Sequence, residues 1–170
     1  AKTILYIVLG ILTFLAPGLS LLIMYWNRMI STLDLEDRQE RFYPFILIIF
    51  YFVLTYVYLK LRLPEFLQHP ALMSYIFGIV MVFVLAFFIN FKVKMSMHTA
   101  GIFGLCGAIL AYNETQIESN MTFLFYLICL GGLVGSARVF LKKHSLTEVL
   151  VGMFVGFSVL FVCVRFSLFI

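Results

Sequence analysis

Six apolar runs alternate with short polar segments along the 170-residue chain. An α-helix needs about 20 consecutive apolar residues to cross the hydrocarbon core of a bilayer. Run length is the informative signal, because a helix inside a bilayer can be apolar all round and need not show helical periodicity. The pattern therefore predicts an all-α integral membrane protein, a six-transmembrane-helix bundle that forms a single domain over residues 1–170. The six predicted spans cover residues 4–26, 44–59, 71–91, 98–112, 121–141 and 145–170.

Prolines, glycines and one capping pattern refine these spans. Pro17 lies inside the first run, where we expect it to kink a helix that a membrane can still accommodate. Pro44 suits the first turn of the second helix. Ser145 can cap the last helix, with Glu148 three residues later as its capping-box partner. The fourth run is rich in Gly and Ala, which let helices approach closely, so we expect it at the centre of the bundle.

Composition supports a membrane protein and excludes several other classes. The chain is 64% hydrophobic and 12% charged, whereas a soluble domain is about half apolar and a quarter charged. A net charge of +4 is too small to indicate nucleic-acid binding. Cys106, Cys129 and Cys163 lie in apolar runs without disulfide or zinc spacing, so we expect small, buried apolar side chains. Apolar runs recur to the last residue, which argues against a signal peptide followed by a soluble protein.

The topology sorts the polar residues between the two sides of the membrane. Six spans place both termini on one side, and segments 27–43, 92–97 and 142–144 on the other. The terminal side receives Lys2, Lys60 and Arg62, with Arg165 reaching towards it. We call the opposite side the basic face, because eight of the twelve Lys and Arg residues and two of the three histidines fall on it. Its members are Arg28, Arg38, Arg41, Lys92, Lys94, Arg138, Lys142, Lys143, His98 and His144.

One candidate site on this face combines His144 with Glu148 and Arg138. His144 and Glu148 are four residues apart at the head of a helix, so they share one side of it. The carboxylate can accept the proton of one imidazole nitrogen, which leaves the other as base or nucleophile. The guanidinium of Arg138 suits phosphate. The alternative is a basic loop that orients the protein in the membrane, followed by a helix cap.

A second candidate segment surrounds the start of the fourth helix. Lys94, Ser96 and His98 lie there, where unpaired backbone N–H groups and the helix dipole favour an anion. Ser96 can add a hydroxyl group and His98 a proton. The alternative is an interfacial histidine with flanking lysines.

A third segment, residues 34–44, contributes Arg38 and Arg41. They are three residues apart and can face the same way if the segment is helical. Four carboxylates lie among them, so the alternative is a solvated, salt-bridged loop in which the acids occupy the arginines. Taken together, the three segments supply what phosphate transfer requires: cations for the phosphate oxygens, a nucleophile, and an acid for the leaving oxygen.

The spacing of these residues resembles the type-2 phosphatidate phosphatase superfamily of six-helix membrane lipid phosphatases, whose motifs are KxxxxxxRP, PSGH and SRxxxxxHxxxD. Arg138, His144 and Glu148 reproduce the spacing of the third motif, with Ala137 in place of Ser and Glu in place of Asp. The second motif aligns with residues 95–98, which keep Ser and His but have Met in place of Pro and Gly. The first motif is absent, although Arg38, Arg41 and Pro44 lie in the expected region.

The resemblance implies a specific assignment of roles. His144 would be the nucleophile that forms a phosphohistidine, Glu148 would orient it, and His98 would protonate the leaving lipid alcohol. The residues that would bind phosphate are Arg138 and Ser96, with Arg38 or Arg41 and the neighbouring Lys94 completing the set. No metal or other cofactor is needed in that mechanism, and the expected partners are a lipid phosphate and the surrounding membrane lipids.

Two other functions remain open. The altered motifs also fit a catalytically changed or inactive member that binds anionic lipid headgroups or a membrane partner. A metal-dependent hydrolase would use His98, His144 and acids from residues 34–40, but no HExxH-type spacing supports it.

The orientation of the site also has two readings. The number of Lys and Arg residues on the basic face favours a cytoplasmic location for that face. Family members commonly work at the outer face of the bacterial inner membrane, and we expect a periplasmic site.

Overall fold

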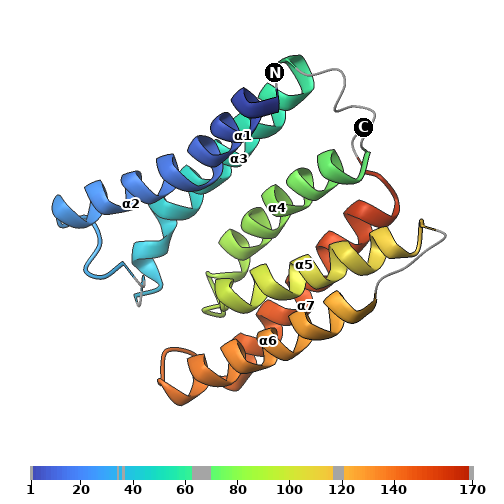
Figure 1. Ribbon diagram of the computed structural model, residues 1–170. Helices are drawn as coiled ribbons and strands as arrows, with labels where there is room; N and C mark the ends of the chain where they lie inside the picture. The colour runs from blue at the N-terminus through green and yellow to red at the C-terminus, as the bar shows by residue number, and fades with distance from the viewer. Residues whose placement is uncertain (1, 34, 36, 63–69, 117–120, 169–170) are drawn as a thin grey trace.

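The computed structural model describes residues 2–33, 35, 37–62, 70–116 and 121–168. Within these residues the chain forms helices joined by turns, and no strand. The helices are α1 (Lys2–Gly10), α2 (Ala16–Trp26), α3 (Phe42–Arg62), α4 (Pro70–Ile89), α5 (Met97–Asn113), α6 (Met121–Phe140) and α7 (Leu146–Arg165). Helices α1 and α2 continue one another through a π-helical segment, Ile11–Leu15. The described chain therefore forms six helical rods (Figure 1), as predicted.

Five of the six rods are long and apolar enough to cross a membrane. The exception is α5, whose 17 residues are at the lower limit for a spanning helix. It carries no Asp, Glu, Lys or Arg and lies among the other helices. Length and composition thus confirm an all-α membrane bundle.

The short helix α5 lies at the centre of its half of the bundle, as its small residues predicted. It packs most extensively against α7 and also against α4 and α6 (Figure 1). Glycine permits this close packing, because a Cβ atom on Gly156 of α7 would collide with the carbonyl group of Ala100 on α5. Gly107 of α5 meets the carbonyl group of Phe157 in the same way. On the other side of the molecule, α3 packs on α4, and α2 packs on α3.

The distortion expected at Pro17 takes the form of the π-helical segment that directly precedes α2. Proline lacks an N–H group, and its ring clashes with the carbonyl group four residues earlier in a regular α-helix. The wider π-helical turn lies at this position, and Thr13 Oγ1 donates to the carbonyl oxygen of Leu9, 2.7 Å away. The helix then continues to Trp26.

Several helix boundaries differ from those predicted by run length. Helix α3 begins at Phe42, so Pro44 does lie in its first turn, and it extends to Arg62. Helix α7 ends at Arg165, five residues before the end of the predicted span. Ser167 adopts a left-handed conformation with φ of 46°, and the amide of Leu168 donates to the carbonyl of Cys163 at 3.0 Å. This turn stays apolar, so hydropathy could not reveal it. Of the turns predicted between the spans, at 60–70 and 113–120, residues 63–69 and 117–120 lie outside the described residues.

The predicted burial of all three cysteines is correct for two of them. Cys106 and Cys163 are buried, whereas Cys129 is exposed, and all three are free thiols. Cys129 lies on an outward face of α6, whose residues 128–130 are all exposed. An apolar run shows that a segment enters the membrane but does not show which of its sides faces the other helices. The prediction for Cys129 was therefore wrong.

Both ends of the described chain lie at one end of the bundle, as the six-span topology predicted (Figure 1). At this terminal end Arg165 Nε donates to Glu114 Oε2 at 3.0 Å. The ion pair confirms that Arg165 reaches towards the terminal side. The opposite end receives the segments predicted to form the basic face.

Candidate active site

Hydrogen bonds join the start of α5 to the turn after α6 and to the first turn of α7. The amide of Ser96 donates to the carbonyl oxygen of Glu148 at 3.1 Å, and Lys94 Nζ donates to the carbonyl oxygen of Lys143 at 3.3 Å. These contacts cross about fifty positions in the sequence. They place two of the three predicted segments in one site.

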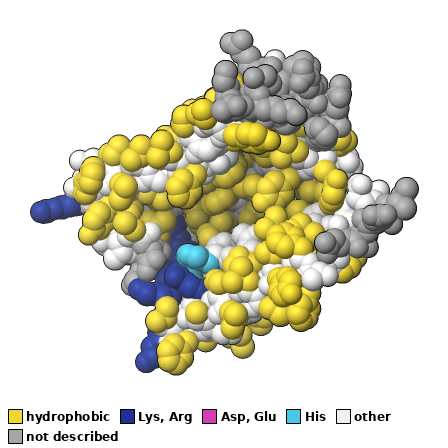
Figure 2. Space-filling model, viewed as in Figure 1, with side chains coloured by type: hydrophobic (Ala, Val, Ile, Leu, Met, Phe, Trp, Pro, Cys, Tyr) yellow, Lys and Arg dark blue, Asp and Glu magenta, His cyan; other side chains and the backbone are white. Residues whose placement is uncertain are grey.

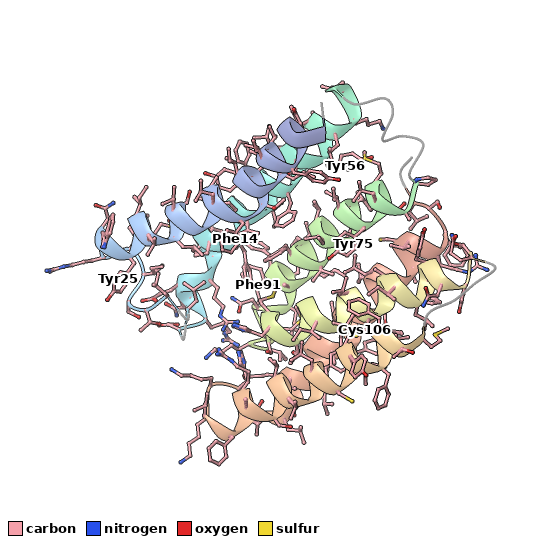
Figure 3. All side chains as sticks on the ribbon, viewed as in Figure 1. Phe14, Tyr25, Tyr56, Tyr75, Phe91 and Cys106 are labelled. Atoms are coloured by element: carbon pink, nitrogen blue, oxygen red, sulfur yellow. The ribbon has the colours of Figure 1, made fainter. Side chains whose placement is uncertain are left out.

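The third segment is joined to the same site by two arginines. Arg38 Nη1 donates to the carbonyl oxygen of Lys92 at 2.9 Å. Arg41 is buried; its Nη1 donates to the carbonyl of Met95 at 3.0 Å, and its Nε donates to that of Leu35 at 2.9 Å. Figure 3 shows nitrogen-bearing side chains gathered where the starts of α3 and α5 meet the end of α6. The structure therefore brings all three segments together at the basic face.

The turn after α6 determines where Arg138 and His144 lie. Lys142 is left-handed, with φ of 55°, and its amide donates to the carbonyl of Val139 at 3.0 Å. The amides of Lys143 and His144 both donate to the carbonyl of Arg138, at 3.1 and 3.3 Å. This is a Schellman motif, which reverses the chain at the end of a helix. This chain reversal therefore accounts for the five residues that separate Arg138 from His144.

The pair predicted at the head of the last helix is formed. His144 Nδ1 lies 3.0 Å from Glu148 Oε2. Because an ionised carboxylate can only accept, the proton must be on Nδ1, and the neutral ring then carries its lone pair on Nε2, at the opposite edge. The same Oε2 accepts from the amide of Ser145 at 3.1 Å, and Ser145 Oγ accepts from the amide of Glu148 at 3.3 Å. The predicted capping box is confirmed, and its carboxylate also holds the imidazole ring.

The surroundings of His144 favour the neutral ring. Its side chain is 2% exposed. Burial lowers the pKa of His144 from its ordinary value of 6.5, and the positive charges of Arg41 and Lys94 act in the same direction. The hydrogen bond and the charge of Glu148 oppose this change without reversing it. At neutral pH the ring therefore holds a lone pair that can act as a base or a nucleophile.

We expect the ring of His144 to titrate below pH 6.5 in the folded protein. The unfolded chain binds this proton more tightly, so the neutral ring contributes stability above about pH 6.5. That contribution is lost as the pH falls through the lowered pKa. The measurement is an NMR titration of ¹⁵N-histidine-labelled protein, with the resonance assigned by its loss in His144→Gln. Glu148→Gln should lower the midpoint further; a wild-type midpoint above 6.5 would show that the carboxylate outweighs burial.

Two side-chain donors of the site are buried without a hydrogen-bond partner among the described residues. They are the hydroxyl group of Ser96 and Nε of Arg138. Ser96 is the N-cap residue of α5, yet its side chain makes no capping bond. A buried donor without an acceptor costs about 1–3 kcal/mol. A bound anion would supply the acceptor that both groups lack.

An open cavity of about 490 Å³ lies beside this constellation. Arg38 and Glu148 line it. Lys92 and Thr147 line it as well, although sequence reasoning gave these two no role in the site. The remaining lining residues are Asp37, Val93, Lys94 and Ser145. Lys92 belonged to the basic face, whereas nothing in the sequence pattern distinguished Thr147. The cavity gives a ligand access to the basic face.

The two described acids of residues 34–40 accept hydrogen bonds from backbone amides. Glu40 Oε2 accepts from the amide of Ser31 at 2.8 Å, and Asp37 Oδ1 accepts from the amide of Gln39 at 2.9 Å. Asp34 and Glu36 lie outside the description. Among the described residues, no three His, Cys, Asp or Glu side chains form a group that could hold a metal ion.

His98 lies in the first turn of α5, two residues after Ser96, and is exposed. It thus differs from His144, which is buried. Met97 stands where the PSGH motif has glycine, and it packs against the hydrophobic core. The bulky side chain is therefore accommodated by the core at this altered position.

The fold and this site define a membrane-embedded helical bundle with a histidine–carboxylate pair and several cations at one end. Residues 12–169 match the family model of the PAP2 superfamily. Nearly the whole chain is covered, and the protein belongs to this superfamily, as the motif spacing predicted. Proteins of the superfamily are generally phosphatases, which indicates activity on phosphate esters. No curated protein and no solved structure matches the chain.

Proposed function

We propose that this protein is a membrane phosphatase that hydrolyses a lipid phosphate monoester or pyrophosphate through a phosphohistidine on His144. The observation that carries the proposal is the 3.0 Å contact between His144 Nδ1 and Glu148 Oε2. It aligns a buried imidazole so that Nε2 presents the lone pair. A positioned carboxylate also stabilises the charge that the ring gains when it forms the phosphorus–nitrogen bond.

The reaction proceeds in two steps. In the first, the lone pair of His144 Nε2 attacks phosphorus, the bond from phosphorus to the lipid oxygen breaks, and His98 gives its proton to that oxygen. In the second, water attacks the phosphohistidine, the phosphorus–nitrogen bond breaks, and inorganic phosphate leaves. His98 takes a proton from that water, so its protonation state is restored. His98 suits this role because it is exposed in the first turn of α5, near the anion-binding helix N-terminus.

The phosphate oxygens bind the two buried donors that lack partners. Arg138 and Ser96 are these donors, and the amide end of α5 adds favourable partial charge. Arg41 has Nε and Nη1 engaged with carbonyl groups, so it holds the segments together and contributes positive charge. Arg38 and Lys94 line the open cavity, where they attract the anion. These side chains supply the positive charge without a metal ion.

A lipid substrate is supported by the position of the site. It lies at one end of a bundle whose helices are long and apolar enough to cross a membrane, and so near the level of lipid headgroups. The test is phosphate release by purified protein from a panel of long-chain phosphatidate, phosphatidylglycerophosphate and polyprenyl pyrophosphate in detergent micelles. At least one should be hydrolysed, with EDTA present. Binding without release from any of them would instead favour an inactive member that holds anionic headgroups.

We place the protein in the bacterial inner membrane with the basic face towards the periplasm. Several cations of that face belong to the proposed site. Their number therefore reflects the function of the site as well as the orientation of the protein in the membrane. Thr115 lies in the exposed turn after α5, at the terminal end. Thr115→Cys in a Cys129→Ala background should resist labelling by an impermeant maleimide in intact cells. Rapid labelling would show that the basic face is cytoplasmic instead.

A further inference from the structure

The bundle carries a hollow on one side. Figure 2 shows it over α4 and α5, between α3 and α6, with walls formed by hydrophobic side chains. Lysine and arginine side chains and one histidine gather at one end of the hollow. The two walls are separate because α3 packs on α4, whereas α6 packs on α5 and α7. The hollow thus has an apolar body and a cationic end.

One face of α5 remains uncovered although this helix is the most enclosed of the bundle. Between positions 97 and 111, the exposed residues are His98 and Gly101. They are three residues apart and therefore on the same side of the helix. A Cβ atom on Gly101 would meet no heavy atom within 4 Å. Open space therefore lies directly beside the backbone at Gly101, one turn deeper than His98.

This arrangement matches one kind of ligand. An amphiphile with an anionic head and a hydrocarbon chain would place its head among the cations and its chain against apolar walls. A rise of 1.5 Å per residue puts Gly101 about 4.5 Å beyond His98 along the helix. That is the position of the first atoms beyond an ester oxygen that lies at His98, and the hydrocarbon chain follows them along the same face. Glycine lets the chain approach the helix backbone, as no larger residue would.

We propose that the hydrocarbon chain of the lipid phosphate lies against this face of α5 and that Gly101 determines which chains fit. The inference rests on the proposed phosphatase function, because it takes the phosphate to be at His144. It assigns to Gly101 a role in substrate specificity that no step of the reaction requires. The residue touches the chain and not the reacting phosphate, so its effects should depend on the chain.

The test is Gly101→Leu, measured on two substrates of different chain content. The leucine side chain enters open space, so the fold should persist, and it occupies the path of the chain. For dioleoyl phosphatidate in detergent micelles we expect kcat/KM to fall by at least about 10-fold. For methyl phosphate, whose single carbon does not reach as far as Gly101, kcat/KM should change by less than about 2-fold. Gly10→Leu is the matched control, since Gly10 is also an exposed helical glycine with no heavy atom within 4 Å of its Cβ position.

Other outcomes would overturn the inference. An equal loss on both substrates would show that Gly101 acts on the phosphate site itself. An unchanged rate on dioleoyl phosphatidate would show that the chain lies elsewhere. If the wild-type protein hydrolysed neither substrate, the phosphatase function would fail, and a binding measurement would still decide the position of the chain.

That measurement uses Gly101→Cys in a Cys129→Ala background, since Cys106 and Cys163 are buried. Dioleoyl phosphatidate should slow the reaction of this cysteine with N-ethylmaleimide several-fold more than dioleoyl phosphatidylcholine does. Equal protection by the two lipids would contradict a chain held through its phosphate. Gly10→Cys in the same Cys129→Ala background should react with N-ethylmaleimide at the same rate whichever lipid is present.

Discussion

His144→Ala is expected to abolish phosphate release, lowering kcat by about 10⁴-fold or more. The variant lacks the imidazole nitrogen that attacks phosphorus in the proposed reaction. Glu148 keeps its capping contact with Ser145 in the variant, so α7 should still begin at the same residue. The measurements are phosphate release and the melting temperature in detergent.

Leu146→Ala is the matched control for this variant. Leu146 lies in the first turn of α7 and is 62% exposed, so its truncation changes the same turn without touching the site. It should retain wild-type activity. A second readout is covalent: wild-type protein quenched in alkali should carry an acid-labile phosphate from a ³²P-labelled substrate, and His144→Ala should carry none. Full activity in His144→Ala would refute the nucleophile assignment.

Arg138→Ala is expected to lower kcat by about 10²–10³-fold, the usual effect of removing one donor to a developing charge. Arg138 Nε is buried and has no partner in the described structure, so its donor capacity is available to the phosphate. Arg138→Lys keeps the charge but loses the planar fork of donors, and should recover only part of the rate. Phosphate release with the same micellar lipid measures both variants.

Lys142→Gly separates the role of Arg138 from the general positive charge of the turn. Lys142 is exposed and left-handed, with φ of 55°, a conformation that glycine adopts without strain. The variant removes one charge near Arg138 and leaves the chain reversal intact. Its kcat should stay within about 2-fold of the wild type. An equal loss in Lys142→Gly and Arg138→Ala would show that the turn acts through charge alone.

The contacts that complete the site could not be predicted from the sequence. Arg41 donates from Nε and Nη1 to the carbonyl groups of Leu35 and Met95, and the pattern of acids and arginines along residues 34–44 did not indicate these partners. The burial of Ser96 likewise depends on the packing of α5 against α7, because its amide contacts Glu148. The contacts of Arg41 with Met95 and of Ser96 with Glu148 join residues more than fifty positions apart, and no local pattern encodes their geometry.

The amino-acid sequence by itself determined the number of helices, the grouping of the basic-face lysines and arginines at one end of the bundle and the pairing of His144 with Glu148. These properties follow from run length, from the alternation of sides and from the geometry within one helical turn. The tertiary structure decided that α7 ends at Arg165, that Cys129 faces outward and that Gly101 borders open space. These properties depend on which sides of apolar helices meet, and apolar helices of similar composition give no sequence signal for that choice.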